Sequence, residues 1–369
     1  MQVGTDRSAR RLRWAIDLLD RFVAEGQTDG AAVAVAHRGE LAGAYDAGFA
    51  APGRPAAADT LWPLASISKS YTAAATMALV ERGLLTLDTT VTSVLPAFRG
   101  DGRERVTLRH LLTHTSGLVY ESPEMERRLV AHTPLESLLD EAYRYPLLFA
   151  PGSRVSYSDY GFALIGRLAS VAAGRPFPEL VHDLVLAPAG LHDTFFPLPP
   201  AQRQRVAHVS GSLGAGTDGA MYSSDYAHDL AHPAFGVVAS AADLLRFGLL
   251  FASGDGGGVL ARATVLRMTR DQNPGHVPGS AYESDASEPH AWGLGFLIKG
   301  ASGFGPDLAS PLSFGHDGGS GCAMWLDPVH EVGYAVVSNR HMLTDLTAFR
   351  YRLKSVGNAV LAGMTLAEG

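Results

Sequence analysis

The chain has 369 residues, of which 46% are hydrophobic and 18% are charged, so it can bury one large or two closely packed globular cores. Its formal net charge of -7 argues against a general nucleic-acid binder, because such proteins usually carry a basic surface. A single cysteine, Cys322, excludes an internal disulfide and a cysteine-rich metal site. Cys322 lies in the strand-like run CAMWLD, which favours a small buried hydrophobe over a nucleophile.

The N-terminus shows no apolar segment followed by a small-residue cleavage site, and no apolar run approaches the ~18 residues of a membrane span. For the sequence as given, we therefore expect a soluble, cytoplasmic protein that does not bind a membrane. The sequence leaves the oligomeric state open.

Apolar residues at helical spacing predict a helix over residues 6–25, which Gly26 ends. The segment 30–50 is typical of two strands joined by a turn at Arg38-Gly39. The pattern then becomes helical, so the middle of the chain is predicted to be rich in helices, at residues 69–82, 106–113, 134–143 and 159–173.

Residues 202–236 are dense in Gly, Ser, Asp, His and Tyr without a period, which predicts a long irregular segment of a length that is often functional. A helical pattern at 240–252 is followed by four strand-like runs, WGLGFLIKG, LSFGHDG, GCAMWLD and EVGYAVVSN, and by a final helix over about 343–362.

Strands at both ends with helices between them favour an α/β fold of the α+β sandwich type, with an antiparallel sheet flanked by helices from both termini. A mainly helical domain would be inserted into it. We expect a discontinuous sheet domain over residues 1–75 and 285–369, and a helical domain with a long active-site loop over residues 76–284.

The stretch LASISKSYT places Ser66 and Lys69 three residues apart at the start of a predicted helix. Positions i and i+3 share a helix face, so the hydroxyl and the ammonium would lie within reach of each other. A hydroxyl beside a lysine can be a nucleophile beside its base. The S-x-x-K pattern alone is weak, because it also occurs as an ordinary polar edge.

Three further segments follow in order: VTLRHLLTHTSGL (106–118), PGSRVSYSDYGFALIGRLA (151–169) and FGHDGGSG (314–321). Together with SISK they resemble the serine β-lactamase and penicillin-binding-protein superfamily. The likeness is to the branch that holds class C β-lactamases, DD-peptidases, D-aminopeptidases and family VIII esterases. It covers about residues 30–340 and implies an α/β sandwich and a helical domain with the active site between them.

The resemblance assigns catalytic roles to four residues. Ser66 would be the acylated nucleophile, and Lys69 a base whose pKa is lowered by burial and by nearby cationic groups. Tyr157 opens Tyr157-Ser158-Asp159, where the family has Tyr-x-Asn, and would pass the proton to the leaving group. Backbone N–H groups of Ser66 and Gly319 would form the oxyanion hole.

Two departures from the family pattern bear on the substrate. Asp159 replaces an amide that donates a hydrogen bond to the acylamino group of a β-lactam, and a carboxylate cannot donate. In the third motif, His316 is expected to be only partly charged, and Asp317 stands where the family has threonine. Both departures point away from anionic substrates. The predicted substrate-binding residues are Asp159, His316, Asp317 and Gly318, with Tyr222 and Tyr226 of the long loop as candidate pocket walls.

We therefore expect a serine hydrolase of the esterase or acyltransferase type, acting without a cofactor on small neutral or cationic esters or amides. The alternatives are a D-amino-acid amidase or peptidase, a weak β-lactamase, and a catalytically silent relative that binds an acylated ligand. Retention of Ser66, Lys69 and Tyr157 argues against the silent relative.

The sequence also bears on a zinc site and on an α/β-hydrolase site. His110 and His114 could imitate a zinc pair, but no Glu follows His110 as in H-E-x-x-H, so we expect no metal. The chain has no G-x-S-x-G elbow, which disfavours an α/β-hydrolase.

Overall fold

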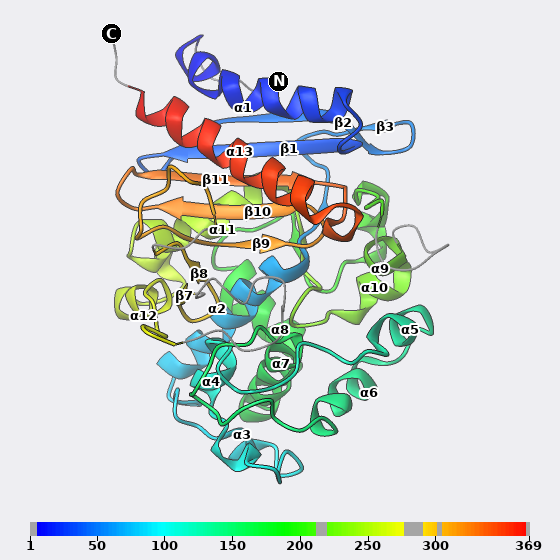
Figure 1. Ribbon diagram of the computed structural model, residues 1–369, viewed down its shortest axis with the longest axis vertical. Coiled ribbons are helices and arrows are strands. Elements are labelled where there is room, and N and C mark those ends of the chain that lie inside the picture. The colour runs from blue at the N-terminus through cyan, green and yellow to red at the C-terminus, as the bar shows by residue number, and fades with distance from the viewer. Residues whose placement is uncertain (1–5, 212–219, 277–290, 301–304, 367–369) are drawn as a thin grey trace.

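A computed structural model describes residues 6–211, 220–276, 291–300 and 305–366. Its main feature is an eight-stranded sheet with the order β3-β2-β1-β11-β10-β9-β8-β7, in which every pair of neighbours is antiparallel (Figure 1). Its strands are β1 (Gly30–His37), β2 (Glu40–Ala51), β3 (Arg54–Pro55), β7 (Ala291–Trp292), β8 (Leu297–Ile298), β9 (Phe314–Gly318), β10 (Cys322–Asp327) and β11 (Val332–Ser338).

Strand pairing joins the two ends of the chain in the middle of this sheet. Strand β1 pairs with β2 through the predicted turn, where Arg38 and Gly39 both have positive φ (53° and 81°). On its other side β1 pairs with β11, from Ala31 opposite Ser338 to His37 opposite Val332. The predicted hairpin and the predicted antiparallel sheet are confirmed.

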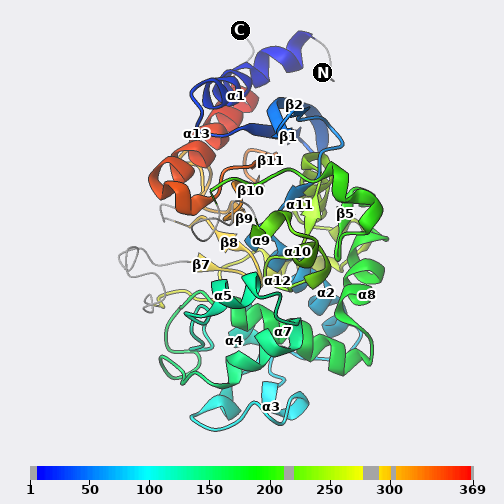
Figure 2. The ribbon, with the colours of Figure 1, turned by 90° about the vertical axis from the view of Figure 1, so that its right-hand side faces the viewer.

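Helices cover both faces of the sheet (Figures 1 and 2). Helices α1 (Asp6–Ala24) and α13 (Leu346–Thr365) lie on one face, where apolar side chains of both pack with Val33 and Val35 of β1. Helix α11 (Ala241–Ala252) lies on the other face, against the core that contains Ala32 and Ala34. This division follows from the alternation of side chains along β1.

Helix α2 (Ser68–Glu81) packs against α7 (Asp159–Ala173) and α8 (Phe177–Val181), and its side chains from Ser68 to Leu79 are all buried. A helix that is enclosed on all sides needs no polar face, which explains its run of alanines. Among the described residues, no helix combines the length and the apolar character needed to cross a bilayer. The other helices of this part of the molecule are α3 (Val91–Val94), α4 (Leu108–Leu112), α5 (Met125–Val130), α6 (Leu135–Leu139), α9 (Ala220–Ser223), α10 (Asp225–Leu230) and α12 (Arg262–Met268).

The expectation that residues 202–236 are wholly irregular is wrong in part, because α9 and α10 lie within them. Residues 212–219 of that segment lie outside the described residues. The division into a sheet domain and a helical domain stays a prediction. Its first boundary, at residue 75, falls inside the continuous helix α2, and its second, at residue 285, lies outside the described residues.

A small three-stranded sheet positions the segment that leads into α2. Strands β4 (Trp62–Pro63) and β5 (Thr194–Phe195) both pair with β6 (Val238–Ala239). The Leu64 N–H then donates to the Val237 carbonyl at 2.9 Å. The backbone immediately before Ser66 is therefore fixed by hydrogen bonds to a segment far away in the sequence.

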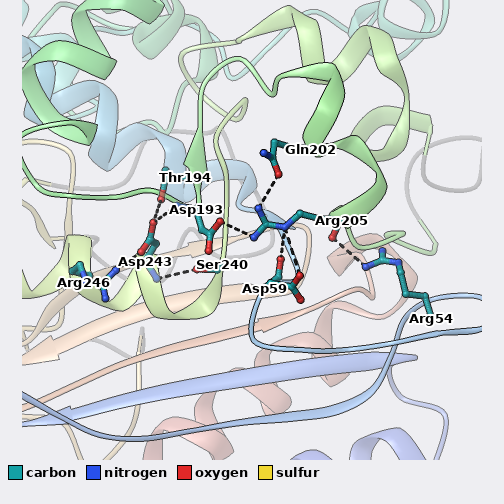
Figure 3. A network of polar contacts seen from close by, with 9 residues as sticks. All are labelled: Arg54, Asp59, Asp193, Thr194, Gln202, Arg205, Ser240, Asp243 and Arg246. Atoms are coloured by element: carbon teal, nitrogen blue, oxygen red, sulfur yellow. Dashed lines mark hydrogen bonds and ion pairs between the residues drawn. The ribbon is translucent and has the colours of Figure 1, made fainter. Parts of the chain in front are cut away.

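A polar network braces this small sheet from outside (Figure 3). The Arg205 guanidinium donates to the Asp193 carboxylate at 2.6 Å and to the Asp59 carbonyl at 2.9 Å. The Asp193 N–H in turn donates to the Asp243 carboxylate on α11 at 2.7 Å. One arginine thus connects the chain before β4 to the chain before β5, and through Asp193 to the helix that covers the large sheet.

Candidate active site

Ser66 lies in a 3₁₀ turn, Ala65–Ile67, between β4 and α2. Ala65 has φ +48°, a left-handed conformation that few residues other than glycine adopt and that costs conformational energy. The neighbours of Ser66 are buried, whereas Ser66 itself is partly exposed. The strained turn therefore presents the Ser66 hydroxyl at the start of the central helix.

Lys69 lies on the next turn of the chain and is fully buried. Its Nζ is 3.1 Å from Ser66 Oγ, 3.1 Å from the Ala234 carbonyl oxygen and 2.7 Å from Asp159 Oδ1. The contacts with Ser66 and Ala234 are hydrogen bonds, and the contact with the buried Asp159 carboxylate is an ion pair. Burial lowers the pKa of Lys69, and the negative charge of Asp159 raises it. The predicted contact between Ser66 and Lys69 is present.

Asp159 is the first residue of α7, where the partial positive charge of a helix N-terminus favours an anion. The Ser158 side chain caps the helix by accepting from the Gly161 N–H at 3.1 Å. Burial raises the pKa of the Asp159 carboxyl, and the Lys69 ammonium lowers it. Asp159 is therefore placed to hold Lys69 by an ion pair.

Tyr157 lies over the same ammonium: Lys69 Nζ is 4.7 Å from the centroid of its ring. The rings of His114 and Trp292 lie 4.5 Å and 5.6 Å from that ring, and the Tyr120 ring lies 5.9 Å away. Lys69 and Tyr157, two of the predicted catalytic residues, are thus in contact with each other, and aromatic rings surround Tyr157.

The two histidines of the 106–118 segment act as scaffold and do not form a pair. His110 Nδ1 accepts from the Thr107 N–H at 3.2 Å at the start of α4. His114 lies beyond the end of α4 with φ +56°, and its Nδ1 accepts from the Ser158 N–H at 3.1 Å. Because the helix ends between them, the spacing of four residues does not place both imidazoles on one helix face.

His316 of β9 is buried beside Tyr157 and Trp292, with its ring 6.3 Å and 5.6 Å from theirs. Burial and the Lys69 charge lower its pKa to about 3, so the imidazole is neutral at pH 7. Its Nδ1 is 2.7 Å from the Asp317 carbonyl oxygen and must carry the proton, which leaves Nε2 as an acceptor. Among the described residues Nε2 has no partner. The expectation of a partly charged His316 is wrong because a motif does not reveal burial.

Asp317 points to the opposite face of the sheet. Its Oδ1 accepts from Trp325 Nε1 at 2.9 Å, and Trp325 belongs to the core beneath α1 and α13. Burial raises the pKa of Asp317 to about 6. Successive residues of a strand face opposite sides, so His316 and Asp317 cannot both face the substrate. We therefore correct the expectation that Asp317 acts on the substrate directly.

The two glycines of the third motif lie against the Ser66 segment. A side-chain carbon added at Gly318 would lie 2.2 Å from the Leu64 carbonyl oxygen, so only glycine permits this contact. Gly319 follows directly, and its carbonyl accepts from the Met342 N–H at 2.8 Å. The backbones of Ser66 and Gly319 thus belong to adjoining segments, and their shared role as an oxyanion hole stays a prediction.

The two tyrosines of the long segment have different places. Tyr222 of α9 packs against Ala65, next to Ser66. Tyr226 of α10 donates from its hydroxyl to the Thr133 carbonyl at 2.5 Å, and its ring stacks on His132 at 4.6 Å. Tyr222 therefore adjoins the Ser66 turn, whereas Tyr226 faces the helices α5 and α6.

Two residues near the site were missed from the sequence because no motif contains them. His341 is buried, its Nδ1 accepts from the Leu343 N–H at 3.2 Å, and its Nε2 lies 3.5 Å from where a Cβ of Gly319 would be. Burial lowers its pKa to about 4. Burial, with the nearby charge of Asp159, raises the pKa of Glu121 to about 8.

Comparison with known proteins identifies the family. The family model described as Beta-lactamase matches residues 15–356. Penicillin-binding protein 4 of Amycolatopsis lactamdurans is 30% identical over 315 residues, covering 82% of this chain and 77% of that protein. Esterase EstB of Burkholderia gladioli is 38% identical over 211 residues, but the match spans only 53% of this chain and 54% of EstB.

A solved structure shows the same fold over nearly the whole chain. The structure titled "EstCE1, a hydrolase with promiscuous acyltransferase activity" matches with a TM-score of 0.79 and 24% identity, covering 96% of this chain and 99% of that chain. At this identity the likeness concerns the fold. Taken with the family match and the arrangement around Ser66, these findings show that the chain belongs to the Beta-lactamase family, in which its relatives include a penicillin-binding protein and an esterase.

Proposed function

We propose that the protein is a serine hydrolase or acyltransferase that acts on small neutral or cationic esters or amides through an acyl-Ser66 intermediate. The observation that carries the proposal is the position of Lys69 Nζ, 3.1 Å from Ser66 Oγ and 2.7 Å from Asp159 Oδ1. A serine hydroxyl is a weak nucleophile at neutral pH, so a base must take its proton as Oγ attacks the carbonyl carbon.

In the acylation step, Ser66 Oγ forms a bond to the carbonyl carbon while its proton passes to the base formed by Lys69 and Tyr157. Lys69 can accept a proton only when neutral, and its burial favours the neutral form. Tyr157 then gives the proton to the leaving alcohol or amine as the bond to that group breaks. Water, or an acceptor alcohol, then attacks the acyl carbon and gives its proton to the same base. The bond from that carbon to Ser66 Oγ breaks, Oγ regains a proton, and the acid or the new ester leaves.

The charges around the site favour a substrate without a carboxylate. His316 and His341 have pKa values lowered to about 3 and about 4, so neither carries a positive charge at pH 7. The Asp159 carboxylate lies 2.7 Å from Lys69 Nζ and offsets the positive charge of that lysine. The name of the relative EstB, an esterase, supports the same substrate class.

A D-amino-acid amidase or peptidase is the second candidate, and Glu121 is the observation that favours it. Its carboxyl is largely enclosed and lies close enough to Asp159 and Lys69 for their charges to change its pKa. An ionised Glu121 would attract the free amine of an amino-acid amide. Such a substrate brings its own positive charge, which offsets the cost of ionising a buried carboxyl.

Intact-mass measurement after incubation with a small fluorophosphonate tests the proposal. The wild type should gain one adduct, and Ser66→Ala should gain none. Ser68→Ala is a matched control two residues away, because Ser68 Oγ accepts from the Val237 N–H at 2.9 Å and is structural. Ser68→Ala should keep the adduct. Equal labelling of wild type and Ser66→Ala would refute the assignment of the nucleophile.

A further inference from the structure

A cavity of about 210 Å³ lies between α5 and the pair α9 and α10. Most of its wall is apolar, formed by Leu129, Val130, Met221, Ala227, Leu230 and Phe235. The polar lining residues are Glu126, His132, Ser224 and Tyr226. The Tyr226 hydroxyl donates to the Thr133 carbonyl, the His132 ring stacks on Tyr226, and Ser224 Oγ accepts from the Ala227 N–H. The cavity therefore offers carbon surface to a ligand.

The inner wall of this cavity adjoins the groups that hold Ser66 and Lys69. Phe235 follows Ala234, whose carbonyl accepts from Lys69 Nζ at 3.1 Å, and its ring stacks on His232 at 3.9 Å. His232 Nδ1 accepts from the N–H of the same Ala234 at 3.1 Å, so the stacked pair adjoins the carbonyl that holds Lys69. On the other side, Met221 packs against the cluster of Ala65 and its neighbours.

The side of the site on which the cavity lies indicates which part of an ester it would take. The leaving group must lie next to Tyr157, its proposed proton donor. The ring of Tyr157 packs with His114, Trp292 and His316, and none of these lines the cavity. The cavity therefore lies away from the side expected for the leaving group, which leaves it for the acyl group.

We propose that this cavity binds the hydrocarbon chain of the acyl group, and that the protein acts on esters of medium-chain fatty acids. The proposal rests on the proposed function at Ser66. An apolar protein cavity of roughly 150 Å³ holds benzene, which has six carbons, so a cavity of 210 Å³ accommodates about eight. Each buried methylene should raise kcat/KM by about two- to fourfold until the cavity is full.

The test is a chain-length series of p-nitrophenyl esters from acetate to dodecanoate, kept below their micellar concentrations. For the wild type, kcat/KM should peak near the octanoate. Ala227→Phe fills the cavity and should lower kcat/KM for the octanoate at least about tenfold while leaving the acetate within twofold. Leu129→Ala enlarges the cavity and should move the optimum to longer chains. These opposite shifts cannot both result from a general loss of stability.

Ala131→Phe is the matched control, because Ala131 is exposed at the end of α5 and does not line the cavity. It should keep the wild-type profile. A second series, alkyl acetates with the chain in the alcohol, separates the two parts of the ester. If Ala227→Phe changes only the alcohol series, or neither series, the acyl-chain proposal is overturned. Fluorophosphonate labelling of Ser66 in each variant reports separately on the proposed function, because that small probe does not need the cavity.

Discussion

Replacing Asp159 by asparagine removes the negative charge nearest to Lys69 and changes the side-chain volume little. Both side chains are buried, with 2.7 Å between Lys69 Nζ and Asp159 Oδ1. The carboxylate raises the pKa of Lys69, so in Asp159→Asn the lysine should lose its proton at a lower pH. The acid limb of kcat/KM, which reports the essential base of the free enzyme, should move in the same direction.

The distance between the charges sets the size of this effect. Two unit charges 2.7 Å apart attract each other by about 1.5 kcal/mol at a dielectric constant of ~80 and by about 6 kcal/mol at ~20. Because Ser66 is partly exposed to solvent, we use the smaller value as the lower bound. At a pH on the acid limb, kcat/KM of Asp159→Asn should therefore exceed that of the wild type about tenfold or more.

The assay is kcat/KM for a neutral ester from pH 4 to pH 9. Asp88→Asn is the control, because the Asp88 side chain is 84% exposed and pairs with Arg109 on the surface. An acid limb that stays in place in Asp159→Asn would refute the view that Lys69 is part of the titrating base.

The same variant has a consequence for stability. In Asp159→Asn, the folded state binds fewer protons at Lys69 than the unfolded chain does, because burial keeps the pKa of the folded state below the ordinary lysine value of 10.5. Stability rises with pH wherever the unfolded state binds more protons. The free energy of unfolding of the variant should therefore approach that of the wild type as pH rises toward the ordinary pKa of lysine, which chemical denaturation at each pH would measure.

Lys69→Ala and Tyr157→Phe should each slow acylation steeply, and the double variant should be little slower than either, because the two residues share one proton path. A double variant whose acylation rate, measured by rapid mixing, falls by the product of the two single effects would contradict that path. Asp317→Asn should change kcat/KM equally for neutral and anionic esters, because Asp317 faces Trp325; a selective gain for anionic esters would place it in the cleft. As pH rises from about 4 to about 6, the free energy of unfolding of the wild type should fall, because the raised pKa of Asp317 makes its folded state bind more protons than its unfolded state. Asp317→Asn should lack this fall in denaturation measured across that range.

The predicted fold was right where a period extends over enough residues. The hairpin of β1 and β2 and the helix α7 were recognised because each carries at least two repeats of its pattern. Helices α9 and α10 contain four and six residues, which is less than two turns and leaves no period to detect. The pattern of elements placed strands from both ends of the chain in one sheet, but it did not give the pairing of β1 with β11, because no local pattern relates segments about 300 residues apart.

The candidate site divides in the same way. Ser66 and Lys69 were found from their spacing, and Tyr157 and Asp159 from the order of the motifs. The misplacement of Asp317 was avoidable, because it directly follows His316 on a predicted strand and the two must face opposite sides. His341 could not be found, because its contact with Gly319 depends on how the end of β11 meets the end of β9.

Burial changes the charge of His316 in a way that the sequence motif does not show. A histidine at the position of a family lysine suggests a weaker cation, but enclosure of His316 beside the Lys69 ammonium removes its charge altogether at pH 7. With Lys69 held by Asp159 at 2.7 Å, the positive charge of the site is already neutralised before a substrate arrives. Long-range attraction then contributes little to binding a neutral ester, so the binding energy must come from backbone donors and from apolar surface. The cavity beside Phe235 supplies that apolar surface, which is why its chain-length profile decides between a specific acyl-chain site and a merely permissive cleft.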